Sequence, residues 1–234
     1  VGTIHSFCLD IVINKGNLIG LPSGLSILEG QKDKLELLKK IYTNYNDAIP
    51  AETQLREILL KIQDYKQRFI SPGMIDKNIQ NIDFIDVYES YNNLLIANRV
   101  IDFDDILFYA YKILMERPKV AATYTRLYKY ILIDEAQDLS QSQLISLRMT
   151  ARKALIIAAD LGQKIYKTDF TWKSTGINVQ GGRTKSLMGA FRSKKEVMDL
   201  ANSLLKHDTT LSEEDIEQPY EAKSSGVMPA ILVA

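Results

Sequence analysis

The sequence has very little of the sulfur and imidazole chemistry that metal sites and disulfides require. Its 234 residues include one cysteine, Cys8, and only two histidines. A single cysteine cannot form an internal disulfide, and a zinc site of ordinary composition needs four cysteine or histidine ligands. We therefore interpret Cys8, which lies among apolar neighbours, as a small core residue in a reducing compartment.

The sequence also lacks an excess of either charge and any long apolar run. Lysine plus arginine and aspartate plus glutamate both number 29, which argues against a protein that coats nucleic acid, although a local basic groove can still bind it. No apolar run approaches the roughly 20 residues that cross a bilayer. The sequence as given opens with no secretory signal pattern. We predict a cytoplasmic protein with no membrane partner.

The phosphate-binding pattern Gly-x-x-x-x-Gly-Lys-Ser/Thr is absent as well, yet the acidic half of a nucleotide site is present at 131–138, ILIDEAQD. The apolar run predicts a strand buried on both faces, and polar residues at the carboxyl end of such a strand lie where α/β sheets bind ligands. The adjacent carboxylates of Asp134 and Glu135 suit a Mg²⁺–nucleotide, one to hold the metal and one to activate a water. The alternative is an ordinary strand end with Asp138 as the N-cap of the next helix.

Hydrophobic periodicity divides the chain into a helical part and an α/β part. Apolar residues at helical spacing predict helices over 31–45, 53–69, 83–99 and 103–116. Residues 3–13 are predicted to begin as a strand. From residue 130 onward the predicted strands are 130–134, 154–159 and 184–191, and the predicted helices are 139–151, 163–166 and 193–205. We expect residues 170–179 to be β-rich and irregular.

The acidic motif and four other stretches resemble UvrD/Rep/PcrA-type superfamily 1 DNA helicases. Residues 134–138 are similar to the family's Walker B motif, 2–8 (GTIHSFC) to its Thr-Phe-His-Ser motif, and 101–107 (IDFDDIL) to its Leu-Asp-Phe-Asp-Asp-Leu-Leu signature. Residues 159–166 (ADLGQKIY) resemble Gly-Asp-x-x-Gln-Ser-Ile-Tyr, and 187–202 resemble Asn-Tyr-Arg-Ser…Ala-Asn, with Ala159 and Ala190 departing from the pattern. Each match is weak or moderate alone, but five in the family's order are a strong signal.

The resemblance implies an α/β fold class: a partial P-loop NTPase (RecA-like) parallel sheet with a large all-helical insertion. The expected divisions are a strand of the first RecA-like domain (1–8), a 1B-like helical insertion (9–128), the Walker B half of the first domain (129–182) and the start of the second (183–234). In the family the phosphate-binding loop precedes the Thr-Phe-His-Ser motif, and further motifs follow the Ala-Asn pair. We therefore expect an internal fragment of a larger helicase that hydrolyses ATP poorly by itself.

For nucleotide chemistry the resemblance implies ATP and Mg²⁺ as cofactors. Asp134 would hold Mg²⁺, and Glu135 would share the metal site and act as general base for the attacking water. Gln163 would approach the γ-phosphate, and Arg192 would supply an arginine finger. Gln137 would couple the nucleotide state to DNA. A surface glutamine and a surface ion pair are the alternatives for Gln163 and Arg192.

For DNA the resemblance implies that Thr3, His5 and Ser6 contact the sugar-phosphate backbone, although a lone histidine is otherwise usually a hydrogen-bonded structural residue. Tyr166 would either stack on a base or pack in the core, and Trp172 is a candidate substitute for the family's next stacking residue. The expected partners are single-stranded DNA, single-strand/duplex junctions and repair proteins. Movement would be 3′→5′.

Three functions are compatible with these residues. The first is a fragment of an ATP-dependent DNA helicase or translocase acting in DNA repair or recombination. The second is a non-catalytic, helicase-derived module that binds DNA or protein. The third is a metal nuclease built on Asp102, Asp104 and Asp105, against which stand their alternative role as helix cap and first-turn acids and the apolar packing residues Phe103 and Leu107.

Overall fold

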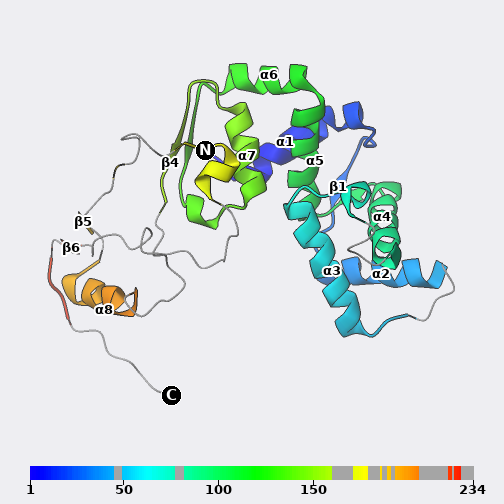
Figure 1. Ribbon diagram of the computed structural model, residues 1–234, viewed down its shortest axis with the longest axis horizontal. Coiled ribbons are helices and arrows are strands. Elements are labelled where there is room, and N and C mark those ends of the chain that lie inside the picture. Colours follow the sequence, from blue (N-terminus) through cyan, green and yellow to red (C-terminus); the bar gives the residue numbers. More distant parts are fainter. Residues whose placement is uncertain are drawn as a thin grey trace. The chain divides into compact units, whose positions relative to one another are not determined.

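The structure is a computed structural model that describes residues 1–44, 49–76, 82–159, 171–178, 185, 189–190, 193–205, 221–222 and 224–227 (Figure 1). The chain forms two compact units. The first contains Val1–Ile133 and Leu139–Ile157, and the second contains Asp134–Asp138 and Ala158–Ala234.

The first unit is mainly helical. Its α-helices are α1 (Ile4–Lys15), α2 (Gln31–Asn44), α3 (Glu52–Gln67), α4 (Ile82–Ala97), α5 (Phe103–Glu116), α6 (Pro118–Leu127) and α7 (Gln141–Thr150). Two short 3₁₀ helices, η1 (Gly16–Ile19) and η2 (Pro72–Met74), lie in the connections. The helices predicted over 31–45, 53–69, 83–99, 103–116 and 139–151 are confirmed, with ends displaced by at most two residues.

Helix α5 shows why these predictions succeed. Ile106 and Ile113, seven residues apart, are both buried, as expected for one helical stripe facing a core. The helix begins after Asp102, whose Oδ1 accepts a hydrogen bond from the backbone N–H of Asp105 at 2.8 Å. It ends before Pro118, because proline disfavours helical backbone at the residue that precedes it.

The strand predicted within residues 1–8 is wrong, because α1 occupies this stretch. Thr3 is the N-cap: its Oγ1 accepts a hydrogen bond from the backbone N–H of Ser6 at 3.2 Å. Cys8, Ile11 and Val12 are buried at helical spacing. The β-branched residues here favour a strand locally, but packing of this stripe overrides that preference.

Two hydrophobic clusters stabilise the first unit. One contains residues of α1, α5 and α6, including Cys8, Ile106 and Tyr124, and the other contains residues of α2, α3 and α4, including Leu38 and Leu59. Burial raises the pKa of the Cys8 thiol to about 12. The interpretation of Cys8 as a core residue is therefore confirmed.

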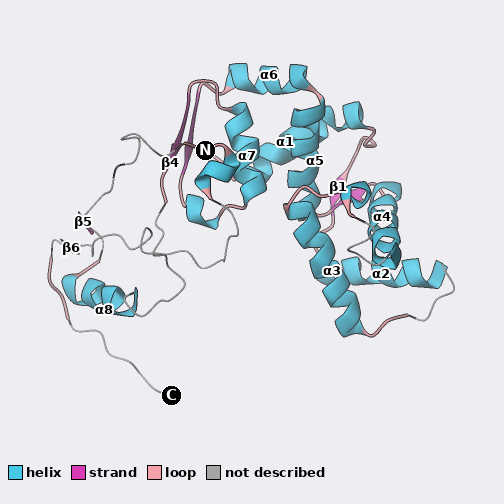
Figure 2. Ribbon diagram, viewed as in Figure 1, coloured by secondary structure: helices cyan, strands magenta, loops and turns pink. Residues whose placement is uncertain are grey.

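Short parallel strand pairs connect these helices (Figure 2). Strand β1 (Ser26–Ile27) pairs with β2 (Val100–Ile101), so the region predicted to be all-helical contains a small sheet. Strand β3 (Tyr130–Ile133) pairs with β4 (Ala154–Ile157), and α7 connects the two. The fold is thus mostly helical with small parallel sheets, which is compatible with the predicted α/β class.

The prediction that the 131–133 strand is buried on both faces is wrong for the described residues. Ile133 is 8% exposed, whereas Leu132 is 73% exposed and its partner Ile156 is 52% exposed. Successive side chains of a strand point to opposite faces, so these values describe a sheet with one face covered. The apolar run by itself could not reveal which residues cover the second face.

The second unit contains η3 (Ala136–Asp138), η5 (Trp172–Thr175), β5 (Gly189–Ala190), α8 (Lys195–Leu205) and β6 (Glu221–Ala222). The helix predicted over 193–205 is confirmed. Residues 171–178 are not β-rich as predicted, since η5 is capped by Thr171 and ends at Gly176 with φ of 74°. The helix predicted over 163–166 lies outside the described residues. Among the described residues, no helix is long and apolar enough to cross a membrane.

Candidate nucleotide site and DNA-contacting helix

The candidate nucleotide site begins where β3 ends. Asp134 and Glu135 follow Ile133 directly, and both are exposed. The backbone N–H of Ala136 donates a hydrogen bond to the carbonyl of Ala158 at 3.0 Å. The segments that follow two neighbouring parallel strands are therefore joined at their carboxyl ends, the edge at which open α/β sheets bind ligands.

Glu135 has an unusual backbone conformation, with φ of 54°. Non-glycine residues adopt this left-handed region uncommonly, and such strain clusters at active sites and switch regions. Asp134 Oδ1 accepts a hydrogen bond from the Glu135 N–H at 3.1 Å, and the Glu135 carbonyl accepts one from the Asp138 N–H at 3.1 Å. These two bonds support a sharp turn that sets the two carboxylates apart from both the strand and the following helix.

Gln137 holds the Glu135 side chain. Its Nε2 donates a hydrogen bond to Glu135 Oε2 at 2.6 Å, and the Gln137 side chain is buried while Glu135 is exposed. An ionised carboxylate accepts such a bond readily. A buried amide thus orients an exposed carboxylate, which is the arrangement a positioned base requires.

The prediction that Asp138 caps the next helix is wrong. Asp138 lies in η3, and the N-cap of α7 is Ser140. Ser140 Oγ accepts a hydrogen bond from the Gln143 N–H at 3.4 Å, and Gln143 Oε1 accepts one from the Ser140 N–H at 2.7 Å. The Ser-x-x-Gln spacing of a capping box was the sequence signal for this start.

The donor set of this turn fits a magnesium ion that is shared with a nucleotide. Among the described residues, no group of three or more histidine, cysteine, aspartate or glutamate side chains is arranged so that it could hold a metal ion by itself. Mg²⁺ with a nucleotide is usually held by one or two carboxylates, with phosphate oxygens and water completing its shell. Asp134 and Glu135 are adjacent and exposed, as this mode requires.

Several predicted site residues lie outside the part of the chain that the structure describes. These are Gln163, Tyr166 and Arg192. Trp172 is described: it is the first residue of η5 and is half-buried. No contact of Trp172 tests its predicted role in stacking, so that role stays a prediction.

The predicted DNA-contacting residues lie in the first turn of α1. The Thr3 and Ser6 side chains are exposed and bonded to each other's backbone, since Ser6 Oγ also donates to the Thr3 carbonyl at 2.7 Å. The first N–H groups of a helix point out of its end and favour anions such as phosphate. His5 is half-buried, and burial lowers its pKa, with the charge of Asp104 acting in the opposite direction.

Phe103 is an aromatic residue that sequence analysis assigned to packing and that the structure leaves 40% exposed. Its ring meets the His5 ring edge-on, with centroids 5.8 Å apart. Leu107, one turn later, is buried as predicted. Position 103 shares the helix face of the buried Ile106, Leu107 and Ala110, but it is the first residue of α5 and lies at the end of that face, so the apolar spacing alone predicts burial.

Comparison with known proteins decides the family. A family model described as the UvrD/REP helicase N-terminal domain matches residues 1–172. The chain belongs to the UvrD/REP helicase family.

Named relatives agree with this assignment. The chain is 28% identical to the ATP-dependent DNA helicase PcrA of Bacillus subtilis and 28% identical to the ATP-dependent DNA helicase Rep of Buchnera aphidicola. It is 25% identical to a probable DNA helicase II homolog of Mycoplasma capricolum. Each match covers 89% of this chain but only 29% to 33% of the relative. The chain therefore spans about a third of the length of these helicases.

In this UvrD/REP chain, the three aspartates of the nuclease hypothesis, Asp102, Asp104 and Asp105, are bonded to other side chains of the protein. Lys66 Nζ lies 2.9 Å from Asp102 Oδ2 and 2.7 Å from Asp105 Oδ1, and all three side chains are at most 1% exposed. Asp104 Oδ1 accepts a hydrogen bond from Gln67 at 2.9 Å. Because an ammonium group already neutralises this site, the nuclease hypothesis is wrong, and the alternative of helix cap and first-turn acids is confirmed.

The electrostatics of this Lys66 cluster follow from burial and charge together. Burial raises the pKa of Asp105 to about 7, although Lys66 opposes the shift. Burial would also raise the pKa of Asp102, but the charge and hydrogen bond of Lys66 hold it below its usual value. Burial would lower the pKa of Lys66, yet the charges of Asp105 and Asp102 raise it. Lys66 thus neutralises the charge of the Asp102 carboxylate, whereas the Asp105 carboxyl group tends to keep its proton.

Proposed function

We propose that the chain is part of an ATP-dependent motor that moves on single-stranded DNA, and that β3, α7 and β4 belong to a RecA-like P-loop NTPase sheet. The observation that carries this proposal is the geometry of Glu135. Its backbone is strained, its carboxylate is exposed at the end of a parallel strand, and a buried glutamine orients it. Membership of the UvrD/REP family and the names of the relatives support the same function.

The proposed chemistry divides between the two carboxylates. A bound Mg²⁺–ATP would supply the phosphoryl group and charge neutralisation. Asp134 would hold the metal through its carboxylate. Glu135 would accept the proton of the attacking water, and Gln137 would keep the accepting oxygen in place. The proposed partners of this step, Gln163 at the γ-phosphate and Arg192 as arginine finger, follow from the family motifs.

The proposed DNA face is the first turn of α1 with the start of α5. Thr3 and Ser6 would contact phosphates near the exposed helix N-terminus. His5 and Phe103 would add an imidazole and an exposed aromatic ring beside them. Tyr166 and Trp172 would contact bases, and the helical residues 9–128 would form the 1B-like insertion. The proposed substrates are single-stranded DNA and single-strand/duplex junctions, in DNA repair or recombination.

The test is the DNA-stimulated ATPase of the product of the complete reading frame that encodes this chain. Glu135→Gln keeps the size and the hydrogen bond to Gln137 but cannot accept a proton. We expect it to lower the single-strand-stimulated rate by roughly 10²–10⁴-fold, the usual contribution of a general base. Asp138→Asn, in the same turn, is the matched control and should retain the wild-type rate.

The outcome also separates the motor from the second function. A wild-type protein that binds single-stranded DNA but hydrolyses no ATP with or without it would contradict the motor. That result would favour a non-catalytic, helicase-derived binding module, because DNA contact at α1 does not depend on Glu135.

A further inference from the structure

The charges of this neutral chain are distributed unevenly. Residues 117–133 and 139–159 contain seven lysine or arginine residues and no aspartate or glutamate. The rest of the chain therefore carries seven more acidic than basic residues. A local excess of this size creates a positive surface potential that the overall composition conceals.

The fold gathers five of these cations at one place, where α6 and α7 end and β3 and β4 begin. The backbone N–H of Arg152 donates to the Tyr128 carbonyl at 3.0 Å, and that of Lys153 donates to the Lys129 carbonyl at 2.9 Å. Thr125 Oγ1 donates to the Met149 carbonyl at 3.2 Å and so joins the ends of the two helices. We call this surface the basic edge; its cations are Arg126, Lys129, Arg148, Arg152 and Lys153.

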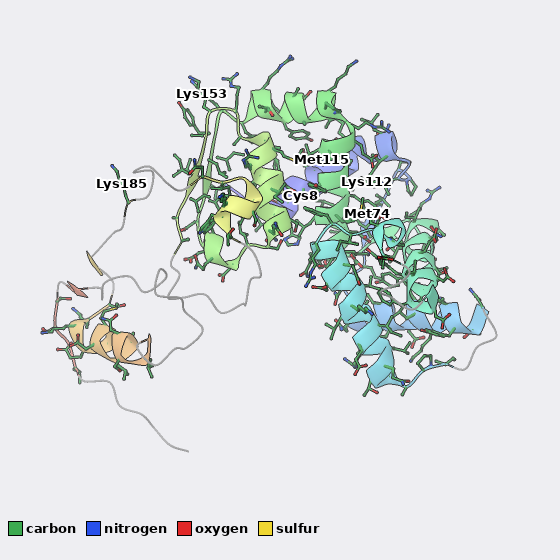
Figure 3. The ribbon with its side chains drawn as sticks, viewed as in Figure 1. Cys8, Met74, Lys112, Met115, Lys153 and Lys185 are labelled. Carbon is green, nitrogen blue, oxygen red and sulfur yellow. The ribbon has the colours of Figure 1, made fainter. Side chains whose placement is uncertain are left out.

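The side chains of the basic edge are available to a partner. All five cations are exposed, and none forms an ion pair with an acid among the described residues. Figure 3 labels Lys153, which lies beside α6 at the beginning of the strands. Like charges held this close together repel one another, so an anionic partner would relieve the repulsion.

Helix stabilisation explains only part of this arrangement. Arg126 and Arg148 lie in the last turns of α6 and α7, where cations interact favourably with the helix dipole. Lys129, Arg152 and Lys153 lie beyond the helix ends. Their charges therefore call for a separate explanation.

Exposed aromatic rings alternate with these cations. Tyr128 is 38% exposed and Tyr130 is 52% exposed, and Lys129 Nζ lies 5.6 Å from the Tyr130 ring centroid. Cations that follow a phosphate backbone, together with aromatic rings on which bases stack, are the combination used to bind single strands without sequence preference. A duplex would offer phosphates to the lysines but no unstacked bases to the tyrosines.

The basic edge adjoins the proposed DNA face. Phe7, in the first turns of α1 with Thr3 and Ser6, meets the Tyr128 ring edge-on at 5.4 Å. The nucleotide site follows the opposite, carboxyl ends of the same strands. A strand of DNA could thus contact both surfaces in succession.

We propose that the basic edge is a second contact for single-stranded DNA and binds the segment that continues past the first turn of α1. Lys129, Arg152 and Lys153 bind consecutive phosphates, and Tyr128 stacks on a base. The choice of DNA as the anion rests on the proposed function, whereas the basic edge itself requires no nucleotide and no hydrolysis.

The test uses the 234-residue chain and a fluorescein-labelled oligothymidylate, with anisotropy measured across a salt series. Lys129→Gln/Lys153→Gln removes two cations of the basic edge. Lys32→Gln/Lys40→Gln, two exposed residues of α2, is the control with the same change in charge. We expect the first variant to bind roughly tenfold more weakly at low salt and its salt slope to fall by ~1.4, the release expected for two single-strand phosphate contacts. The control should match the wild type.

Tyr128→Ala should weaken binding while leaving the salt slope unchanged, because a stacked ring releases no counterions. Equal affinity of wild type and Lys129→Gln/Lys153→Gln would overturn the proposal. So would competition by polyglutamate as strong as that by unlabelled oligothymidylate, since the partner would then be acidic protein. If the wild type showed no ATPase activity that depends on Glu135 while the binding results held, the proposed motor would be refuted. The basic edge would remain a DNA contact.

Discussion

Two pairs of carboxylates in this chain have similar sequence signals and opposite environments. Asp102 and Asp105 follow the short strand β2, and Asp134 and Glu135 follow the strand β3. The first pair is buried around Lys66, whereas the second is exposed on a strained turn. The difference teaches that neighbouring acids indicate a metal site only when no buried cation already neutralises them.

The deciding residue is far away in the sequence. Lys66 lies 36 residues before Asp102 and reaches it from the end of α3. Tyr91 adds a hydrogen bond from its hydroxyl to Asp102 Oδ2 at 3.3 Å. Such a cluster is costly to bury and depends on every partner being present. The exposed pair has no such dependence, because water solvates both of its carboxylates.

The largest expected effect on this contrast comes from Lys66→Met, which leaves two carboxylates buried without a cation. We expect the free energy of unfolding to fall by ~3–5 kcal/mol, measured by urea denaturation of the 234-residue chain. Arg56→Met removes an exposed ion pair on the same helix and should leave the midpoint unchanged. A Lys66→Met variant as stable as wild type would show that the cluster contributes no net stability.

A smaller effect should appear in the pH dependence of stability. Burial raises the pKa of Asp105 to about 7 from 3.8, so the folded chain keeps a proton that the unfolded chain loses. Stability should therefore fall as pH rises from about 4 to 7, by up to ~1.4 kcal/mol per pH unit from this group.

Asp105→Asn is neutral at every pH and should remove this contribution. The measurement is the free energy of unfolding against pH for the variant and the wild type, and the difference between the two curves gives the contribution of Asp105. Asp104→Asn, the neighbouring position, should leave the wild-type curve in place. Parallel curves for Asp105→Asn and wild type would mean that Asp105 ionises in the folded chain as it does in the unfolded one.

The smallest expected effect is at the exposed pair. Asp134→Asn retains the Oδ1 acceptor for the Glu135 N–H and should change the free energy of unfolding by no more than ~0.5 kcal/mol. Thermal unfolding followed by circular dichroism measures this, with Lys66→Met as the contrasting variant. A loss of several kcal/mol at Asp134 would mean that these acids support the fold rather than a ligand.

Local patterns in the sequence were sufficient for much of the fold. The helices over 31–45, 53–69, 83–99 and 103–116 carry apolar stripes, and they are found where expected. The two strands on either side of α7 were also predicted. The candidate nucleotide turn was identified from residues 134–138 alone, because the order of residue types around a strand end is itself a local signal.

Other features were misjudged because a local pattern was ambiguous. The β-branched residues of α1 favour a strand, but Cys8, Ile11 and Val12 pack together only as a helix. Ser140 rather than Asp138 begins α7, although either residue type can cap a helix. Phe103 looked like a packing residue, although its place before the buried stripe leaves it exposed beside His5.

By itself the sequence determined most of the helices, the β3–α7–β4 unit and the family motifs, since these depend on residues close together in the chain. Only the tertiary structure decided which acids are neutralised, because Lys66 reaches Asp102 and Asp105 from another helix. It also decided that Arg126, Lys129, Arg148, Arg152 and Lys153 form one surface, because hydrogen bonds between separate segments bring their ends together. Burial and charge depend on neighbours in space, and a linear pattern does not contain them.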